Sequence, residues 1–223
     1  WSIDSQSINK YVDNSLQALD SIKFIIEFQQ PLAIDPNMLP IYLEEISSTL
    51  CSAAYKLTTE KFDAKQLTQA DFQQVETSMT EGHPSFVANN GRIGFDSGDF
   101  QSYAPEAGNP IRLLWLATHK RRTSFSAAID YDYQSLIEQE FDLTTRKHFA
   151  AILQQLGLDI DNYLFMPVHP WQWFNKLAHV YAADIASNDI VCLGYGDDHY
   201  LAQQSIRTFF NISNPEKHYI KTA

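Results

Sequence analysis

Three polar segments carry the side chains best suited to chemistry, and two of them interrupt otherwise apolar stretches that read as strands. The first, residues 81–95, reads EGHPSFVANNGRIGF and combines a histidine, two asparagines, an arginine and three glycines. The other two are residues 167–172 (PVHPWQ) and 204–208 (QSIRT). Glycine lets the backbone approach a ligand closely, and arginine, histidine and hydroxyl donors suit a polyanion. We therefore expect a phosphate-handling site, such as a nucleotide site.

The third segment can be read as part of a strand over residues 200–211. Ser205 and Arg207 would then point to one face and Ile206 into the core. An arginine fork can hold a phosphate through two hydrogen bonds, and the hydroxyl adds a donor. Lys221, on the next strand of an expected hairpin, could supply a second positive charge. An exposed strand face with ordinary polar residues explains the same spacing, and spacing alone favours that plainer interpretation.

Two histidines lie within these segments. His83 is held between Gly82 and Pro84 in a constrained turn, where it could donate to a phosphate or act as an acid or base. A simple polar turn residue is the commoner explanation. His169 follows an apolar strand and precedes Pro-Trp-Gln. That position suits a pocket wall, and it suits a satisfied core histidine equally well.

The Asn-Asn-Gly sequence at residues 89–91 is typical of a hairpin turn, which explains these residues without any ligand. Arg92, just beyond, is harder to explain as a turn residue alone. The remaining histidines show no pairing of the kind zinc requires, so no metal site is expected. The sequence contains no GxSxG, Walker A or GxGxxG motif, which removes the main support for hydrolase, P-loop and Rossmann functions.

The composition, 44% hydrophobic and 19% charged over 223 residues, is that of a globular protein with one or two domains. A formal charge of -11 opposes general nucleic-acid binding but permits a local cationic pocket. Neither a membrane-span-length apolar run nor a secretory signal is evident, so the cytoplasm is the default location. Cys51 and Cys192 are expected to be buried, reduced thiols. Because the chain begins with Trp1 and ends in Ile-Lys-Thr-Ala, we expect a fragment.

The first third of the sequence reads as helical. Apolar residues at spacings of three and four between Ile8 and Ile26 predict a helix that ends near Pro31. A second helix is expected over residues 40–56, and a third over residues 68–79 with Asp71 in its first turn. Three antiparallel helices of this length would form a compact unit, residues 1–80.

The remainder, residues 81–223, mixes strands and helices. Residues 111–126 read as strand, turn and strand, and Gly157 is placed to close the helix before it at a C′ position. The other expected elements are helices over 133–156 and 171–186, the latter opened by Pro170, and strands over 163–168, 190–193, 200–211 and 218–222. The predicted fold class is therefore α+β: an N-terminal helical bundle followed by a mainly antiparallel sheet with flanking helices.

Four segments together carry a resemblance to a known family: EGHPSFVANNGRIGF, DFQSYAPE, MPVHPWQW and QQSIRTFFNISNPEKHYIKT, in that order. They resemble the NRPS-independent siderophore (NIS) synthetases, the IucA/IucC family, across most of residues 81–222. The resemblance implies an ATP- and Mg²⁺-dependent ligase that adenylates a carboxylate and joins it to an amine or hydroxyl. It also implies a cupped-hand fold, with residues 1–80 as thumb, the rest as fingers, and the palm missing. The chain alone would then be inactive, and the full-length enzyme could be a homodimer.

The same resemblance implies roles for individual residues. It assigns catalysis to His83, Arg207 and Lys221, and contacts with the substrate to His169 and Gln172. The ATP-binding residues that it implies are Gly82, His83, Asn90, Arg92, Ser205, Arg207, Thr208 and Lys221.

The substrate class follows from a departure from the family pattern. Citrate-using members commonly carry GHPxHPxxKxRxGF, whereas this chain has Phe86, Val87 and Asn90 at the second His-Pro and the lysine. Loss of that cation weakens the case for citrate. The sequence is closer to members that join N-hydroxy-N-succinyl-diamines, such as the alcaligin, putrebactin and desferrioxamine synthetases. Two alternatives stay open: a citrate-using synthetase of the aerobactin type, and a non-catalytic binding or oligomerisation module. No nucleic-acid or membrane partner is expected.

Overall fold

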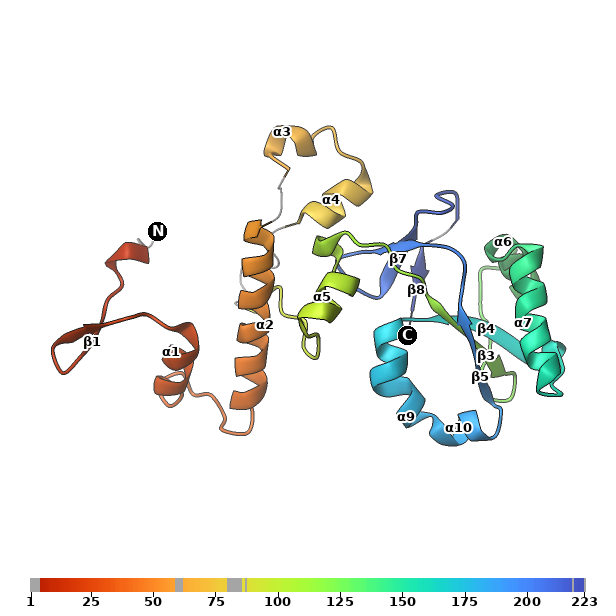
Figure 1. Cartoon of the computed structure of the whole chain (residues 1–223), viewed down its shortest axis with the longest axis horizontal. Helices are drawn as coiled ribbons and strands as arrows, with labels where there is room; N and C mark the ends of the chain where they lie inside the picture. The colour runs from red at the N-terminus through yellow and green to blue at the C-terminus, as the bar shows by residue number, and fades with distance from the viewer. Residues whose placement is uncertain (1–4, 59–61, 80–85, 87, 218, 223) are drawn as a thin grey trace. The chain divides into compact units, whose positions relative to one another are not determined.

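A computed structural model describes residues 5–58, 62–79, 86, 88–217 and 219–222. Its contacts divide the chain into two compact units (Figure 1). The first comprises residues 1–61 and 80–97, and the second residues 62–79 and 98–223. This division differs from the expected boundary at residue 80, because the short helices before residue 80 pack within the second unit.

The first unit begins with a hairpin rather than with a long helix. Strands β1 (Lys10–Val12) and β2 (Ser15–Gln17) pair antiparallel across a two-residue turn. Asp13 and Asn14 in that turn both have positive φ, 49° and 61°, the geometry that favours Asp and Asn in tight hairpins. The helix expected from Ile8 is therefore wrong before α1, which spans Ser21–Glu27.

Most of the predicted apolar stripe in the first unit is exposed. Of the residues that defined it, Tyr11, Leu16 and Leu19 are more than half exposed, whereas Ile25 is buried. The second predicted helix is confirmed as α2 (Leu39–Thr58), which contacts α1. The compact three-helix unit expected from the sequence is therefore replaced by a hairpin, a short helix and one long helix.

The second unit opens with two short helices, α3 (Ala64–Leu67) and α4 (Phe72–Ser78). Each begins with a capping box in which an aspartate and a glutamine exchange bonds with the backbone; in α4 these are Asp71 and Gln74. The third predicted helix therefore starts four residues later than expected, because Asp71 is its N-cap. Helix α5 (Ser97–Tyr103) begins at the last residue of the first unit, and η2 (Pro105–Ala107) follows it.

The main sheet of the second unit has the antiparallel order β4–β3–β5. Its strands are β3 (Leu114–His119), β4 (Tyr163–Val168) and β5 (Ile190–Tyr195). Because successive residues of a strand face opposite sides, Trp115 and Ala117 join one core cluster and Leu114 and Leu116 another. Both faces of β3 are consequently buried.

Helices cover both faces of this sheet, and they lie on opposite sides of it in Figure 1. One layer is α6 (Tyr133–Glu140) and α7 (Leu143–Gln155). The other is α8 (Pro170–Gln172), the π-helix η4 (Trp173–Leu177), α9 (Ala178–Val180) and α10 (Ala182–Ala186). The single helix predicted over 133–156 is two helices because Asp142 caps the second. Gly157 closes α7 with φ 72°, as predicted.

A second antiparallel sheet, β6–β7–β8, together with the turn between β6 and β7, carries four of the ten predicted site residues. Its strands are β6 (Tyr200–Ala202), β7 (Thr208–Asn211) and β8 (Ile220–Lys221). Buried Ile111, Leu113 and Phe209 lie in its core. The strand expected over 200–211 is interrupted by a turn. No strand follows β3 before α6, so the second half of the predicted strand–turn–strand is also absent.

The predicted α+β class with mainly antiparallel sheets is confirmed. Both cysteines are exposed rather than buried, and neither is in a disulfide within the described structure. None of the described helices combines the length and the apolar character needed to cross a membrane.

Candidate functional site

Ser205, Arg207 and Thr208 lie on a tight turn that joins β6 to β7, residues 203–208, which we call the 203–208 turn. The Ser205 hydroxyl donates to Thr208 Oγ1 over 2.7 Å and accepts from the Thr208 amide over 3.1 Å. Ile206 adopts a left-handed conformation with φ 62° and is only half-buried. The prediction that Ile206 points into the core from a continuous strand is therefore wrong, since the left-handed residue reverses the chain there.

Lys221 lies beside this turn, as the expected hairpin required. It pairs with Thr208 in the β7–β8 register, and directly opposed residues of antiparallel strands share one face. The Thr222 amide also donates to the Arg207 carbonyl over 2.8 Å. Arg207 and Lys221 are both exposed. The structure thus brings Ser205, Arg207, Thr208 and Lys221 together at one end of the sheet.

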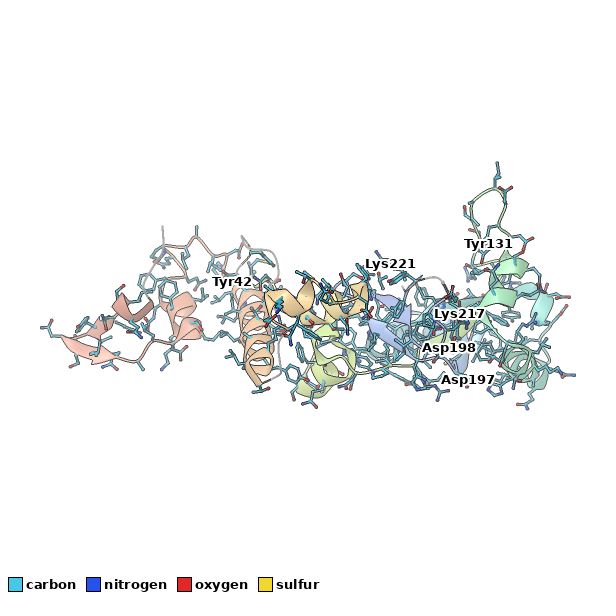
Figure 2. The ribbon with its side chains drawn as sticks, turned by 90° about the horizontal axis from the view of Figure 1, so that it is seen from above. Tyr42, Tyr131, Asp197, Asp198, Lys217 and Lys221 are labelled. Carbon is cyan, nitrogen blue, oxygen red and sulfur yellow. The ribbon has the colours of Figure 1, made fainter. Side chains whose placement is uncertain are left out.

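An ion pair fixes the segment that leads into β8. Lys217 bonds to the Asp198 carboxylate and donates to the Glu140 carbonyl over 2.6 Å, and Asp198 and Lys217 lie close together in Figure 2. Asn211 Nδ2 donates to Asp198 over 2.8 Å. Because Asn211 ends β7 and Lys217 precedes β8, Asp198 anchors the connection that carries Lys221.

The 203–208 turn also borders an open groove of about 580 Å³. Two aromatic rings line it, Phe72 from α4 and Tyr219, with their centroids 6.2 Å apart in an edge-to-face arrangement. Its other lining residues are Glu76, Gln203, Gln204, Ser205 and Thr208. The lining of the groove therefore includes the Ser205 and Thr208 hydroxyls and two aromatic rings. The cationic residues Arg207 and Lys221 lie at the neighbouring end of the sheet.

Sequence reasoning missed the residues of α4 that hold this turn. Gln203 Nε2 donates to Gln73 Oε1 over 2.5 Å, and the Gln204 amide donates to the Glu76 carboxylate over 2.9 Å. Gln204 Nε2 donates to the Glu76 carbonyl over 2.8 Å. The Asp71 capping box signals where α4 starts, but nothing in the sequence signals that α4 packs on a turn about 130 residues away.

His169 is the N-cap of α8, and Gln172 is the last residue of that helix. His169 is 2% exposed, and its Nδ1 accepts the Trp171 amide over 3.1 Å as the N-cap. The ring packs against Tyr103 and Phe209. Within the described structure His169 Nε2 and Gln172 Oε1 are buried without a hydrogen-bond partner. Burial lowers the pKa of His169 from 6.5 to about 4, so the ring is neutral at pH 7.

Asn90 and Arg92 belong to the first unit, where they lie along α2. The Asn90 carbonyl accepts from Ser52 over 3.1 Å, and the Arg92 amide donates to Ser48 over 2.7 Å. Asn90 is 7% exposed and its side-chain amide donates to Asn89. Residues 88–91 form a turn, but the described residues on either side form no hairpin strands. Gly82 and His83 lie outside the described residues.

Gly91 explains why this turn can lie against α2. A Cβ atom there would lie 2.9 Å from the Glu45 carbonyl and 3.1 Å from the Thr49 hydroxyl. Only glycine lets the two backbones approach so closely.

Among the described residues, no group of three His, Cys, Asp or Glu side chains is arranged to hold a metal ion.

A family model, IucA / IucC family, matches residues 71–223. The chain belongs to the IucA/IucC family. The predicted membership is thus confirmed, and the match includes the 203–208 turn, Lys221 and His169. Putrebactin synthase of Shewanella sp. (strain MR-4) is 47% identical over 221 residues, which is 99% of this chain and 35% of that protein.

Solved structures give the same fold. The petrobactin biosynthesis protein AsbB from Bacillus anthracis matches with a TM-score of 0.82 and 28% identity, covering 96% of this chain and 35% of that one. ATP-bound aerobactin synthetase IucA from Klebsiella pneumoniae matches with a TM-score of 0.63 and 18% identity, covering 91% and 36%, which shows the fold alone. This member of the IucA/IucC family spans about a third of the length of the relatives it matches.

Proposed function

We propose that the full-length protein is an ATP-dependent siderophore synthetase that joins N-hydroxy-N-succinyl-diamine units through amide bonds. The observation that carries this proposal is the 47% identity to putrebactin synthase over 99% of the chain. Phe86 and Asn90 support the same substrate class, because they replace the second His-Pro and the lysine of the citrate-using pattern. A succinyl-hydroxamate unit carries a single carboxylate, the one that reacts, and so has less need of that lysine than a tricarboxylate.

The donor set around the 203–208 turn fits the phosphates of ATP. Arg207 offers a planar fork and Lys221 a point charge; both residues are exposed, and Lys221 lies opposite Thr208 across the strand pair. Phe72 and Tyr219 offer aromatic surface for the base on the same groove. ATP, when bound, supplies the leaving group: the substrate carboxylate displaces pyrophosphate, and the amine then displaces AMP. Arg207 and Lys221 would offset the charge that develops on the phosphates.

The remaining assignments extend this proposal. Gly82, His83, Asn90 and Arg92 are proposed as further ATP contacts on the strength of the family pattern. His169 and Gln172 are proposed on the substrate side, and their unpartnered buried polar atoms are consistent with a polar neighbour there. Mg²⁺ bound to the ATP phosphates, a homodimeric full-length enzyme and a cytoplasmic location belong to the same proposal.

A pyrophosphate-release assay tests the function. The full-length protein is incubated with ATP, Mg²⁺ and an amine acceptor, with either an N-hydroxy-N-succinyl-diamine or citrate as the carboxylate. Release with the succinylated diamine supports the proposal. Release with citrate but not with the succinylated diamine would favour the aerobactin-type alternative instead. No release with either acid would favour a non-catalytic binding or oligomerisation module.

A further inference from the structure

We propose that Glu76 on α4 is a positioning residue that holds the 203–208 turn in its ATP-binding shape. This inference rests on the proposed ATP site. Glu76 accepts the Gln204 amide with its carboxylate over 2.9 Å and the Gln204 side chain with its carbonyl over 2.8 Å. A single residue of α4 therefore accepts hydrogen bonds from both the main chain and the side chain of Gln204, the residue immediately before Ser205.

The turn needs such support because its backbone is strained. Ile206 has φ 62°, a left-handed conformation that is a genuine outlier for a β-branched residue. Its amide donates to the Gln203 carbonyl over 2.7 Å, and the Arg207 amide donates to the Ser205 carbonyl over 2.7 Å. Strained residues of this kind persist only where the surrounding structure fixes them, and they concentrate at functional sites.

Two residues of α4 provide that surrounding structure, and they differ in chemistry. Gln73 accepts from the side chain of Gln203, which is 5% exposed. Glu76 instead accepts a main-chain amide with a carboxylate, and hydrogen bonds to charged groups are roughly twice as strong as neutral ones. Because it bonds to the backbone, Glu76 acts on the path of the chain itself. The direction in which Ser205 and Arg207 present their side chains depends on that path.

Glu76 is expected to affect ATP binding more than the chemical step. Its carboxylate accepts a hydrogen bond from the Gln204 amide, and it is not among the groups assigned to the phosphates, which are Ser205, Arg207, Thr208 and Lys221. Loss of the carboxylate would let the turn sample other conformations, which lowers the fraction of protein ready to bind ATP. The apparent affinity for ATP falls by that fraction, whereas the rate from the correctly bound state is largely kept.

The test compares Glu76→Ala with Glu76→Gln in the full-length protein by pyrophosphate release. The glutamine oxygen can accept the same amide, so Glu76→Gln is expected to stay within about threefold of wild type in KM for ATP. Glu76→Ala is expected to raise that KM about tenfold, with kcat changed less than about threefold. Val75→Ala, one residue earlier on α4 and outside the groove lining, is the matched control and should behave as wild type.

Hydrogen–deuterium exchange gives a second readout that does not depend on activity. The Gln204 amide should exchange faster in Glu76→Ala than in wild type, but not in Glu76→Gln, and thermal unfolding checks that each variant is folded. An unchanged KM and unchanged exchange in Glu76→Ala would overturn the inference. So would a glutamine variant as impaired as the alanine variant in both KM and exchange, because an oxygen acceptor at position 76 would then not hold the turn. If wild type itself releases no pyrophosphate, the proposed function fails, and exchange still decides whether Glu76 holds the turn.

Discussion

Acidification from pH 7 to 5.5 should destabilise the protein through His169. The imidazole is 2% exposed and packs edge-on against Tyr103, with ring centroids 4.8 Å apart. Nδ1 already accepts the Trp171 amide, so in the neutral ring the proton sits on Nε2. A second proton would have to go to Nδ1, where it would break the cap and place a charge in a buried site. Burial accordingly lowers the pKa of His169 to about 4.

The direction and size of the effect follow from linkage between protonation and folding. The unfolded chain binds a proton at His169 below about pH 6.5, whereas the folded protein binds one only near pH 4. The stability associated with the neutral ring is therefore fully present above pH 6.5 and is lost as the pH falls toward 4. The difference between the two pKa values corresponds to about 3 kcal/mol in total, of which about 1 kcal/mol is lost between pH 7 and 5.5.

Denaturant unfolding of wild type and His169→Asn at the two pH values measures this contribution. Asparagine is also a good N-cap and does not titrate, so the variant keeps the cap and loses the proton site. We expect wild type to lose about 1 kcal/mol more than the variant on acidification. An NMR titration should place the His169 pKa well below 6. Equal pH dependence of the two proteins, or an imidazole that titrates near pH 6.5, would refute the reasoning.

Three further outcomes are expected. Arg207→Ala should cut pyrophosphate release by about 100-fold in the full-length enzyme. The release rate of Arg207→Lys should lie between those of wild type and Arg207→Ala, because lysine keeps the charge but loses the planar fork. Unchanged release in Arg207→Ala would contradict the role assigned to Arg207. Gly91→Ala should lower the free energy of unfolding by about 1–3 kcal/mol, because the new methyl meets the Glu45 carbonyl at 2.9 Å, and an unshifted urea midpoint would contradict this close contact. Tyr200→Phe removes the 3.0 Å hydrogen bond to the buried Glu140 carboxylate and should cost about 1.5–3 kcal/mol in the same measurement, whereas a neutral effect would show that Glu140 is satisfied without it.

Elements with strong local signals could be predicted from the sequence. The strand over residues 163–168 and the helix end at Gly157 agree with the structure, because a bounded apolar run and a C′ glycine act locally. The helix after Pro170 was also predicted, although the π-turn within it was not. Lys221 beside Thr208 followed from a simple hairpin between neighbouring strands.

Where the prediction failed, the backbone conformation of a few turn residues outweighed the local pattern of apolar residues. The three-and-four spacing from Ile8 suggested a helix, but Asp13 and Asn14 tolerate positive φ and turn the chain into a hairpin. Residues 200–211 suggested one strand, because β-propensity gives no warning that Ile206 will adopt a left-handed conformation. That conformation is held by bonds from Glu76 and Gln73 on α4, which are remote in sequence.

The sequence by itself determined the family, the antiparallel α+β class and the residue types available for binding phosphate, because motifs and periodicities are local properties of the chain. Only the tertiary structure decided which of those residues meet. It brought Ser205, Arg207, Thr208 and Lys221 together at one end of the sheet and packed the buried His169 ring against Phe209. It also placed Glu76 against the 203–208 turn. The physical reason is that a strained turn needs partners from outside its own segment, and packing, rather than local propensity, selects them.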